Sequence, residues 1–320
     1  MNNSIYLFDF LKYATKKHNI ASLIWIALNI TLISCTYGLV GASGNIPKAF
    51  LIGTILYLIS VTIVLSPFGE WVCRLQTGCK KPSENVSGRL QPILDEVVAE
   101  ARKKNPELPE KIKLYFKDDD EPNAFALGRH TVCCTKGLLN YSNKEIQAIM
   151  GHEIGHIANH DTDLILVVTG GNILINILFG FFRIMFKLFV LMGRLMSLLI
   201  PGVGGLIFDL VMSFYTFVTG TLLGGFMNLW IRLGIWLTMH SSRKEEFAAD
   251  TYSCELGYAA GLATFFNRLL KKEFKQTGGI KVKKGLFEAL EESHPDTDLR
   301  LENIQAYMVT PVLIPEESNA

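Results

Sequence analysis

Long runs of apolar residues alternate with polar stretches along this chain. Residues 22–40 and 50–67 contain no charged side chain, and each run has about the ~20 residues that a helix needs to cross a bilayer core. A longer apolar region, residues 164–240, is interrupted by Gly and Pro at residues 201–205. The pattern predicts an integral membrane α-helical protein with two helical hairpins, the first over residues 21–67 and the second over the longer region, and therefore four transmembrane helices.

The charges beside the first hairpin predict its orientation. The loop between its two runs carries only Lys48, whereas both flanks are more basic, with Lys12, Lys16 and Lys17 before it and Arg74, Lys80 and Lys81 after it. Because basic flanks stay on the cytoplasmic side, we expect the N-terminal tail, residues 1–20, and the polar parts of the chain to be cytoplasmic. A cleaved signal peptide is the competing interpretation of the first run, but the second run follows too closely to favour it.

The polar stretch between the hairpins, residues 68–163, predicts mixed α and β structure. An amphipathic pattern from Leu90 indicates a helix, and residues 112–116 have the pattern of a short strand. Two further short strands, residues 123–127 and 131–135, flank a Gly-Arg turn and predict a β-hairpin. We therefore expect an α+β domain that begins after the first hairpin.

A capping box predicts the start of the helix that carries the first candidate chemistry. Ser142 and Glu145 form the S-x-x-E pattern, and apolar residues follow at helical spacing through His160. After the second hairpin, residues 241–309 again predict helices, and residues 310–320 predict a loose tail. The polar domain is thus expected in two parts, separated by the second hairpin.

The composition narrows the function classes. Hydrophobic side chains make up 49% of the 320 residues, which fits a membrane protein, and the net charge of +1 gives no basic field for nucleic acid. The six cysteines form no CxxC pair, so we expect free thiols in a reducing compartment. Arg183, Lys187 and Arg194 share one stripe of an otherwise apolar helix, so they should face lipid headgroups or a wet cavity.

Residues 151–156, Gly-His-Glu-Ile-Gly-His, contain an HExxH motif on the capped helix. The i, i+4 spacing places His152 and His156 on one helix face, where one metal ion can contact both imidazoles. Glu153 lies beside that face, where it can act as a general base toward an attacking water and then as a general acid toward the leaving amine. The motif also occurs by chance on capped surface helices, but the capping box and the adjoining apolar region favour a metal site.

A catalytic zinc ion takes three protein ligands, so a third ligand must come from elsewhere in the chain. His160 continues the histidine stripe, but it lies about 12 Å along the helix from His152, too far for one ion unless the helix breaks. Glu246 is favoured, because the second hairpin returns the chain to the same membrane face just before it. Asp250 shares the face of Glu246 and could hydrogen-bond a ligand imidazole, although a solvated helix start would also explain both acidic residues.

The order of HEIGH, a membrane hairpin, EFAAD and HPDTDLR resembles the HtpX-type membrane zinc metalloproteases over nearly the whole chain. The CAAX prenyl endopeptidases and the mitochondrial inner-membrane protease Oma are more distant kin. The resemblance implies a cytoplasmic gluzincin-like zinc protease domain and one Zn²⁺ per subunit, with His152, His156 and Glu246 as ligands and Glu153 as the catalytic residue. It also implies a role in membrane-protein quality control and in the stress response.

The resemblance assigns further site residues. Asn123, Ala124 and Phe125 fall on the family's Asn-Ala-Phe segment, where an edge strand pairs with the substrate backbone; an ordinary hairpin strand is the alternative. His294 and Arg300 fall on the HPxxxxR pattern, which implies that His294 helps to stabilise the oxyanion and that Arg300 holds polar structure near the site. Two pairs depart from the commonest form of the family and put the substrate preference in doubt: Arg129–His130 and Cys133–Cys134.

These observations predict a zinc metalloendopeptidase of the bacterial inner membrane, multi-pass and with a cytoplasmic active site. We expect polypeptide substrates, namely misfolded or surplus membrane proteins, and as partners the lipid bilayer and membrane quality-control proteins. Two alternatives stay open. A non-proteolytic zinc-containing scaffold or regulator would not need Glu153, and a CAAX-type prenyl-protein endopeptidase would have more membrane helices.

Overall fold

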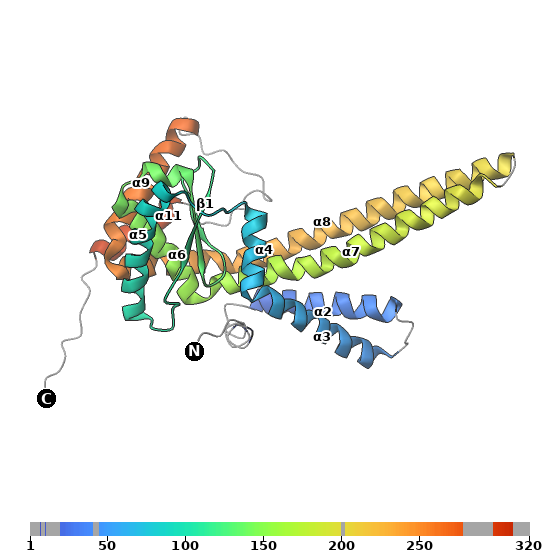
Figure 1. The fold of residues 1–320 in the computed structure, drawn as a ribbon, viewed down its shortest axis with the longest axis horizontal. Helices are drawn as coiled ribbons and strands as arrows, with labels where there is room; N and C mark the ends of the chain where they lie inside the picture. The colour runs from blue at the N-terminus through green and yellow to red at the C-terminus, as the bar shows by residue number, and fades with distance from the viewer. Residues whose placement is uncertain are drawn as a thin grey trace. The chain divides into compact units, whose positions relative to one another are not determined.

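The computed structural model describes residues 7, 10, 20–40, 45–199, 202–277 and 297–309 (Figure 1). The chain divides into two compact units. The apolar unit comprises residues 24–61 and 168–237, and the polar unit comprises residues 1–23, 62–167 and 238–320. Most of the predicted N-terminal tail and all of the predicted C-terminal tail lie outside the described residues.

The apolar unit is built from parts of four helices: α2 (Ile20–Val40), α3 (Ile46–Val64), α7 (Asp161–Ser197) and α8 (Val203–Ser253). Within the described part of the chain, α3 and the Val203–Gly234 portion of α8 are long and apolar enough to cross a membrane. Leu23–Gly38 of α2 is a shorter apolar helix. Candidate membrane helices are therefore present, while the total of four transmembrane helices stays a prediction.

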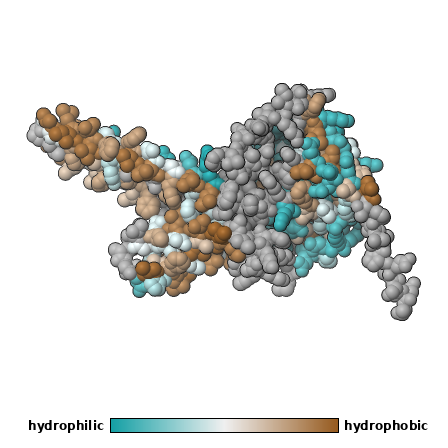
Figure 2. All heavy atoms as spheres, turned by 180° about the vertical axis from the view of Figure 1, so that it is seen from behind, coloured by the Kyte–Doolittle hydropathy of each residue, from teal (hydrophilic) through white to brown (hydrophobic). Residues whose placement is uncertain are grey.

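Aromatic side chains join the helices of the apolar unit. Phe186 of α7 stacks on Tyr215 of α8 with ring centroids 5.0 Å apart, and Trp25 of α2 lies 5.2 Å from Trp230 of α8. Many other large apolar side chains face outward, among them Phe214, and Figure 2 shows hydrophobic surface along the α7–α8 pair. An apolar surface of this extent fits contact with lipid rather than with water.

The last candidate membrane helix and the helix that carries Glu246 are one continuous helix. The sequence pattern predicts separate helices before and after residue 240, but α8 runs without a break from Val203 to Ser253. Residues 235–256 contain neither Pro nor Gly, so no residue there interrupts helical hydrogen bonding. After α8 the chain forms η3 (Cys254–Tyr258), where Gly257 at a φ of 89° leads into α9 (Ala259–Thr277).

The polar unit contains a three-stranded sheet in the order β1-β3-β2. Its strands are β1 (Lys113–Lys117), β2 (Ala124–Ala126) and β3 (Thr131–Thr135). β2 and β3 are antiparallel and join through Gly128 at a φ of 64°, which confirms the predicted hairpin. β1 runs parallel to β3, so β1 and β2 are the two edge strands.

Helices pack against the sheet through a single buried cluster. The cluster joins β1 and β3 to α5 (Glu84–Lys104), α6 (Asn143–Asn159), α9 and α11 (Thr297–Val309) through side chains such as Leu94, Val132, Ile154 and Phe265. Two short elements complete the unit, α4 (Pro67–Thr77) before α5 and the 3₁₀ turn η2 (Lys136–Asn140) before α6. Because α6 lies within this core, its motif residues are held by packing on several sides.

Both ends of α6 are set by local sequence. The Ser142 side chain accepts a hydrogen bond from the Glu145 N–H, while the Glu145 carboxylate accepts one from the Ser142 N–H, so the predicted capping box is confirmed. His160 is the C-cap at a φ of 65°, where its N–H is bonded to the carbonyl oxygens of His156 and Ile157. α6 therefore ends at Asn159, and the next residues begin α7.

Replacing Glu145 by glutamine should reduce the free energy of unfolding by about 1.5–3 kcal/mol at pH 7, because its buried carboxylate accepts charged hydrogen bonds from Arg268 at 3.0 and 3.1 Å. Burial alone would raise the pKa of Glu145, but the bonds from Ser142 and Arg268 lower it. The stabilisation is thus complete above the unfolded-state pKa of about 4.3 and is lost as the pH falls through the lower folded-state pKa.

Urea unfolding in mild detergent at pH 7 and at successively lower pH would measure this difference. Glu107, an exposed glutamate of the same unit, provides the matched control, and Glu107→Gln should leave the free energy of unfolding unchanged. A difference between wild type and Glu145→Gln that did not shrink in acid would contradict the assignment.

Candidate metal centre

α6 and α8 bring the three predicted ligands together in the polar unit. His152 and His156, one turn apart on α6, place their Nε2 atoms 3.1 Å apart. Glu246 of α8 places its Oε2 atom 3.5 Å from His152 Nε2 and its Oε1 atom 3.5 Å from His156 Nε2. The three ligand atoms lie within 4.8 Å of one another, and the His152 and Glu246 side chains are buried.

The chemistry and spacing of these donors fit a zinc ion. Two imidazole nitrogens and one carboxylate oxygen form a known catalytic zinc ligand set, which leaves a fourth position for water. With bonds of about 2.0–2.1 Å in tetrahedral geometry, ligand atoms lie roughly 3.3 Å apart. The 3.1 Å between the two Nε2 atoms and the 3.5 Å from each of them to an oxygen of Glu246 are close to that value, so the donor set fits the ion.

A carboxylate supports each ligand imidazole through its other ring nitrogen. His152 Nδ1 lies 2.9 Å from Asp250, and His156 Nδ1 lies 3.0 Å from Asp161. Burial lowers the pKa of His156, but Asp161 and Glu246 outweigh it and raise the pKa well above its usual value. Surroundings that favour an imidazolium also favour a metal cation, and the carboxylates keep Nε2 directed at the ion.

Arg300 of α11 joins these acidic groups. Its guanidinium donates to both Asp250 oxygens at 2.6 and 2.7 Å and lies 2.9 Å from Glu246, while its flat face lies 4.5 Å from the Phe266 ring centre. Burial alone would raise the pKa of Asp250, but the bonds from Arg300 and His152 lower it. The buried cation therefore keeps Asp250 ionised as the acceptor for His152.

Glu153 lies beside the edge of the sheet. Its carboxylate accepts a hydrogen bond of 2.9 Å from the Ala126 N–H, and its other oxygen lies 4.0 Å from His152 Nε2. Asn123 and Leu127 bond to β3 through their backbones, so the backbone groups of Ala124, like the N–H of Ala126, point away from β3. The predicted substrate segment thus forms an edge strand whose open side faces Glu153.

Other sequence candidates lie elsewhere. His160 is outside the ligand group and lies 3.5 Å from Asp163, in agreement with the argument that it is too far along the helix. His294 lies outside the described residues. Arg183 and Lys187 are exposed on α7 in the apolar unit, as is Arg194, which lies 3.8 Å from Asp209.

Asp161 and the polar network beneath the β2–β3 turn were not among the sequence candidates. The Arg129 guanidinium of that turn donates to both carboxylate oxygens of the fully buried Asp163 at 2.6–3.1 Å, while the Arg129 backbone N–H donates to Glu70 of α4. A signal for Asp161 existed in its position just after the histidine helix, where an acidic residue can reach the last histidine. No local pattern pairs Arg129 with Asp163, because the two residues meet only through folding.

Replacing Arg129 by methionine should cost about 3–5 kcal/mol in the free energy of unfolding, because it leaves the Asp163 carboxylate buried without its cation. The double variant Arg129→Met/Asp163→Asn should recover part of the lost free energy of unfolding, because it also removes the buried, unpaired charge of Asp163. Urea unfolding of wild type, both single variants and the double variant gives the coupling energy. Strict additivity of the two single effects would show that the pair does not act as a unit.

Comparisons with known proteins show similarity to a family of peptidases and to several of its members. Residues 84–308 match peptidase family M48. Protease HtpX of Psychrobacter sp. is 26% identical over 314 residues, which cover 90% of this chain and 95% of the relative. Protease HtpX of Hahella chejuensis is 28% identical over 322 residues, covering 89% of this chain and 98% of the relative.

Two further similarities cover less of the compared protein. A Protease HtpX homolog of Bifidobacterium longum is 33% identical over 99 residues, which cover 29% of this chain and 30% of the relative. The crystal structure of S. mikatae Ste24p is similar with a TM-score of 0.40 and 15% identity, covering 91% of this chain and 66% of that one. The match to the family profile includes α6, α8 and α11, and with them every residue of the ligand cluster. The chain therefore belongs to peptidase family M48.

Proposed function

We propose that this protein is a zinc-dependent membrane endopeptidase in which His152, His156 and Glu246 hold the metal and Glu153 is the general base. One observation carries the proposal: a three-donor metal cluster lies beside a carboxylate that is hydrogen-bonded to an open edge strand. A purely structural zinc site would close its fourth position with another ligand and would need no base next to it. The arrangement therefore supports hydrolysis rather than a scaffold role.

Zinc, when bound, would polarise the scissile carbonyl and lower the pKa of the attacking water. Glu153 takes the proton from that water and then delivers it to the leaving amine, so the same carboxylate serves in both halves of the reaction. The Ala126 N–H holds one oxygen of this carboxylate, which orients the other toward the histidines. Asp250 and Asp161 keep the histidines aligned while charge changes at the site.

The open side of β2 would bind the substrate as an additional strand. The outward-facing backbone groups at Ala124 offer hydrogen bonds to an extended peptide, and they need no particular substrate side chain. Asn123 and Phe125 flank Ala124 and contact β3 instead, so their part is to hold the strand in place. By the family resemblance, His294 would then help to stabilise the oxyanion.

An extended, unfolded segment is the substrate conformation that such a site requires. With apolar helices in the chain and basic residues flanking the first of them, the proposal extends to misfolded or surplus membrane proteins cut at the cytoplasmic face of the bacterial inner membrane. Membrane quality control and the stress response are the proposed setting.

Removal and return of the metal would test this function. The protein purified in mild detergent should contain one zinc per chain and cleave casein, lose cleavage in 1,10-phenanthroline, and regain it when zinc is added back. The same protein kept in non-chelating 1,7-phenanthroline is the matched control and should stay active. Cleavage that persists after zinc is removed, or zinc-loaded protein that cleaves neither casein nor denatured membrane proteins, would contradict the proposal.

A further inference from the structure

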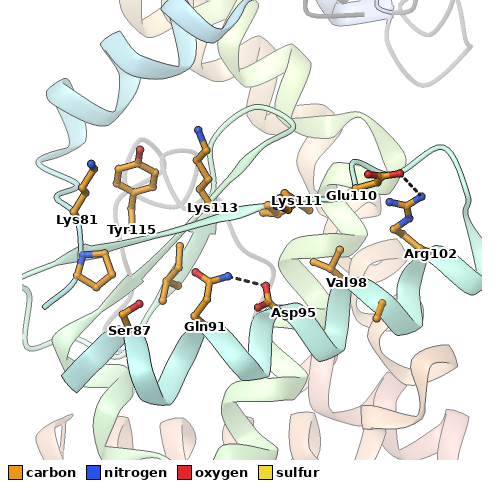
Figure 3. Close-up of a pocket in the computed structure, with 14 residues that line it drawn as sticks. Lys81, Ser87, Gln91, Asp95, Val98, Arg102, Glu110, Lys111, Lys113 and Tyr115 are labelled. Atoms are coloured by element: carbon orange, nitrogen blue, oxygen red, sulfur yellow. Dashed lines mark hydrogen bonds and ion pairs between the residues drawn. The ribbon is translucent and has the colours of Figure 1, made fainter. Parts of the chain in front are cut away.

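A groove lies in the polar unit, between α5 and the edge strand β1 (Figure 3). Its volume is about 830 Å³, and none of the residues that line it belongs to the metal centre. One wall is formed by α5, from Ser87 to Arg102, and the other by residues 110–115 of β1 and the segment before it. The groove is therefore separate from the site proposed for catalysis.

The backbone of β1 is available on this side. Lys113 donates its N–H to the His130 carbonyl, so the backbone groups of Lys113 and Tyr115 are directed at β3. Phe116 points the opposite way and exchanges two hydrogen bonds of 2.8 Å with Lys80. Leu114, two residues earlier, points its N–H and C=O to the same outer side as Phe116, toward the groove.

The segment before α5 pairs with the outer edge of β1 through one residue only. Lys80 makes the single antiparallel bridge to Phe116, and Pro82 follows two residues later. Proline has no N–H with which to continue the ladder, so the remaining edge beside Leu114 stays open. A strand supplied by another polypeptide would continue the bridge that Lys80 begins.

Charge and hydrophobicity alternate along the groove. Lys113 of β1 points away from α5, as Figure 3 shows, and Lys111 lies two residues earlier, just before the strand. Among the described residues neither lysine has an ion-pair partner. Ile112 and Leu114 point to the other face, where Val98 of α5 adds to an apolar floor. The lining cations are Lys81, Arg102, Lys111 and Lys113, and the lining carboxylates are Asp95 and Glu110.

We propose that this groove binds an extended polypeptide segment, in which acidic and apolar residues alternate, as an additional strand on β1. The acidic side chains would share a face with Lys111 and Lys113, the apolar side chains would face Val98 and Leu114, and the backbone would bond to Leu114. β1 has five residues, Lys113–Lys117, which span about 16 Å at ~3.3 Å per residue. Because Lys80 already pairs with Phe116, the bound segment would lie beside Leu114 and the residues that precede the strand. A polypeptide bound in this groove would be held through a segment that lies away from the metal centre.

Binding of a designed peptide tests this inference without relying on catalysis. The probe is a fluorescein-labelled heptapeptide of alternating glutamate and valine, titrated against full-length protein carrying Glu153→Gln in neutral detergent. We expect saturable binding by fluorescence polarisation. A heptapeptide with the central valine replaced by proline, and one with lysine in place of glutamate, should each bind at least tenfold more weakly.

Reversing the charge of the strand identifies the site. Lys111→Glu/Lys113→Glu should weaken binding of the acidic probe at least tenfold and strengthen binding of the lysine peptide, a gain that a misfolded variant could not show. Lys271→Glu/Lys272→Glu, the same reversal at exposed positions of α9, is the matched control and should leave the affinity unchanged. The inference is overturned if the acidic probe does not bind, if the proline peptide binds equally well, or if both reversals have the same effect.

Discussion

Glutamine in place of Glu153 should slow peptide cleavage by about 10²–10⁴-fold while the protein keeps its zinc. The amide cannot take a proton from water at neutral pH, yet its oxygen can still accept the hydrogen bond from the Ala126 N–H. The side chain is also outside the three-donor cluster, so the metal ligands are unchanged. Loss of activity with retained metal would therefore separate the role of a base from that of a ligand.

The measurement pairs the kcat for casein cleavage with metal analysis and with the free energy of unfolding of each protein. Glu107→Gln, the same change at an exposed position, should match wild type in all three. If Glu153→Gln cleaved casein at the wild-type rate, another group would have to be the base. If it lost its zinc, Glu153 would belong to the ligand set.

Leucine in place of Arg300 should cost about 3–5 kcal/mol in the free energy of unfolding of the metal-free protein. The change leaves the buried Asp250 and Glu246 carboxylates without the guanidinium that lies 2.6–2.9 Å from them. Bound zinc supplies positive charge next to Glu246, so the difference from wild type should be smaller in the zinc-loaded protein. Loss of packing on Phe266 would destabilise the metal-free and the zinc-loaded protein equally. A smaller effect with zinc would therefore show that the lost positive charge is the cause.

Urea unfolding with and without chelator would measure both differences. Arg300→Lys keeps the charge but lacks the planar guanidinium that bonds both Asp250 oxygens. Its free energy of unfolding should therefore lie between those of wild type and Arg300→Leu. An equal loss in the metal-free and zinc-loaded forms of Arg300→Leu would contradict the electrostatic explanation and would leave packing as the cause.

The sequence alone determined the features that depend on neighbouring residues. The capping box fixes the start of α6, and the i, i+4 spacing puts His152 and His156 on one side of it, because helix geometry repeats within a single turn. The β2–β3 hairpin follows from two short strands around Gly128. The apolar runs likewise predicted helices long enough to cross a membrane, because the thickness of the bilayer sets the length that such a helix needs.

Only the tertiary structure decided how distant segments meet. The sequence already favoured Glu246 as the partner of the two histidines, but only the structure gives the 3.5 Å separations between them. The contact of Asp161 with His156 and the bonds from Arg300 to Asp250 also come from the structure alone. It also shows that α8 continues unbroken into the ligand helix and that β1 lies parallel to β3, with Lys80 paired to Phe116 on its outer edge. Such contacts depend on the packing of a whole core around α6, and no pattern within one segment of the sequence encodes which partner the folded chain will bring to it.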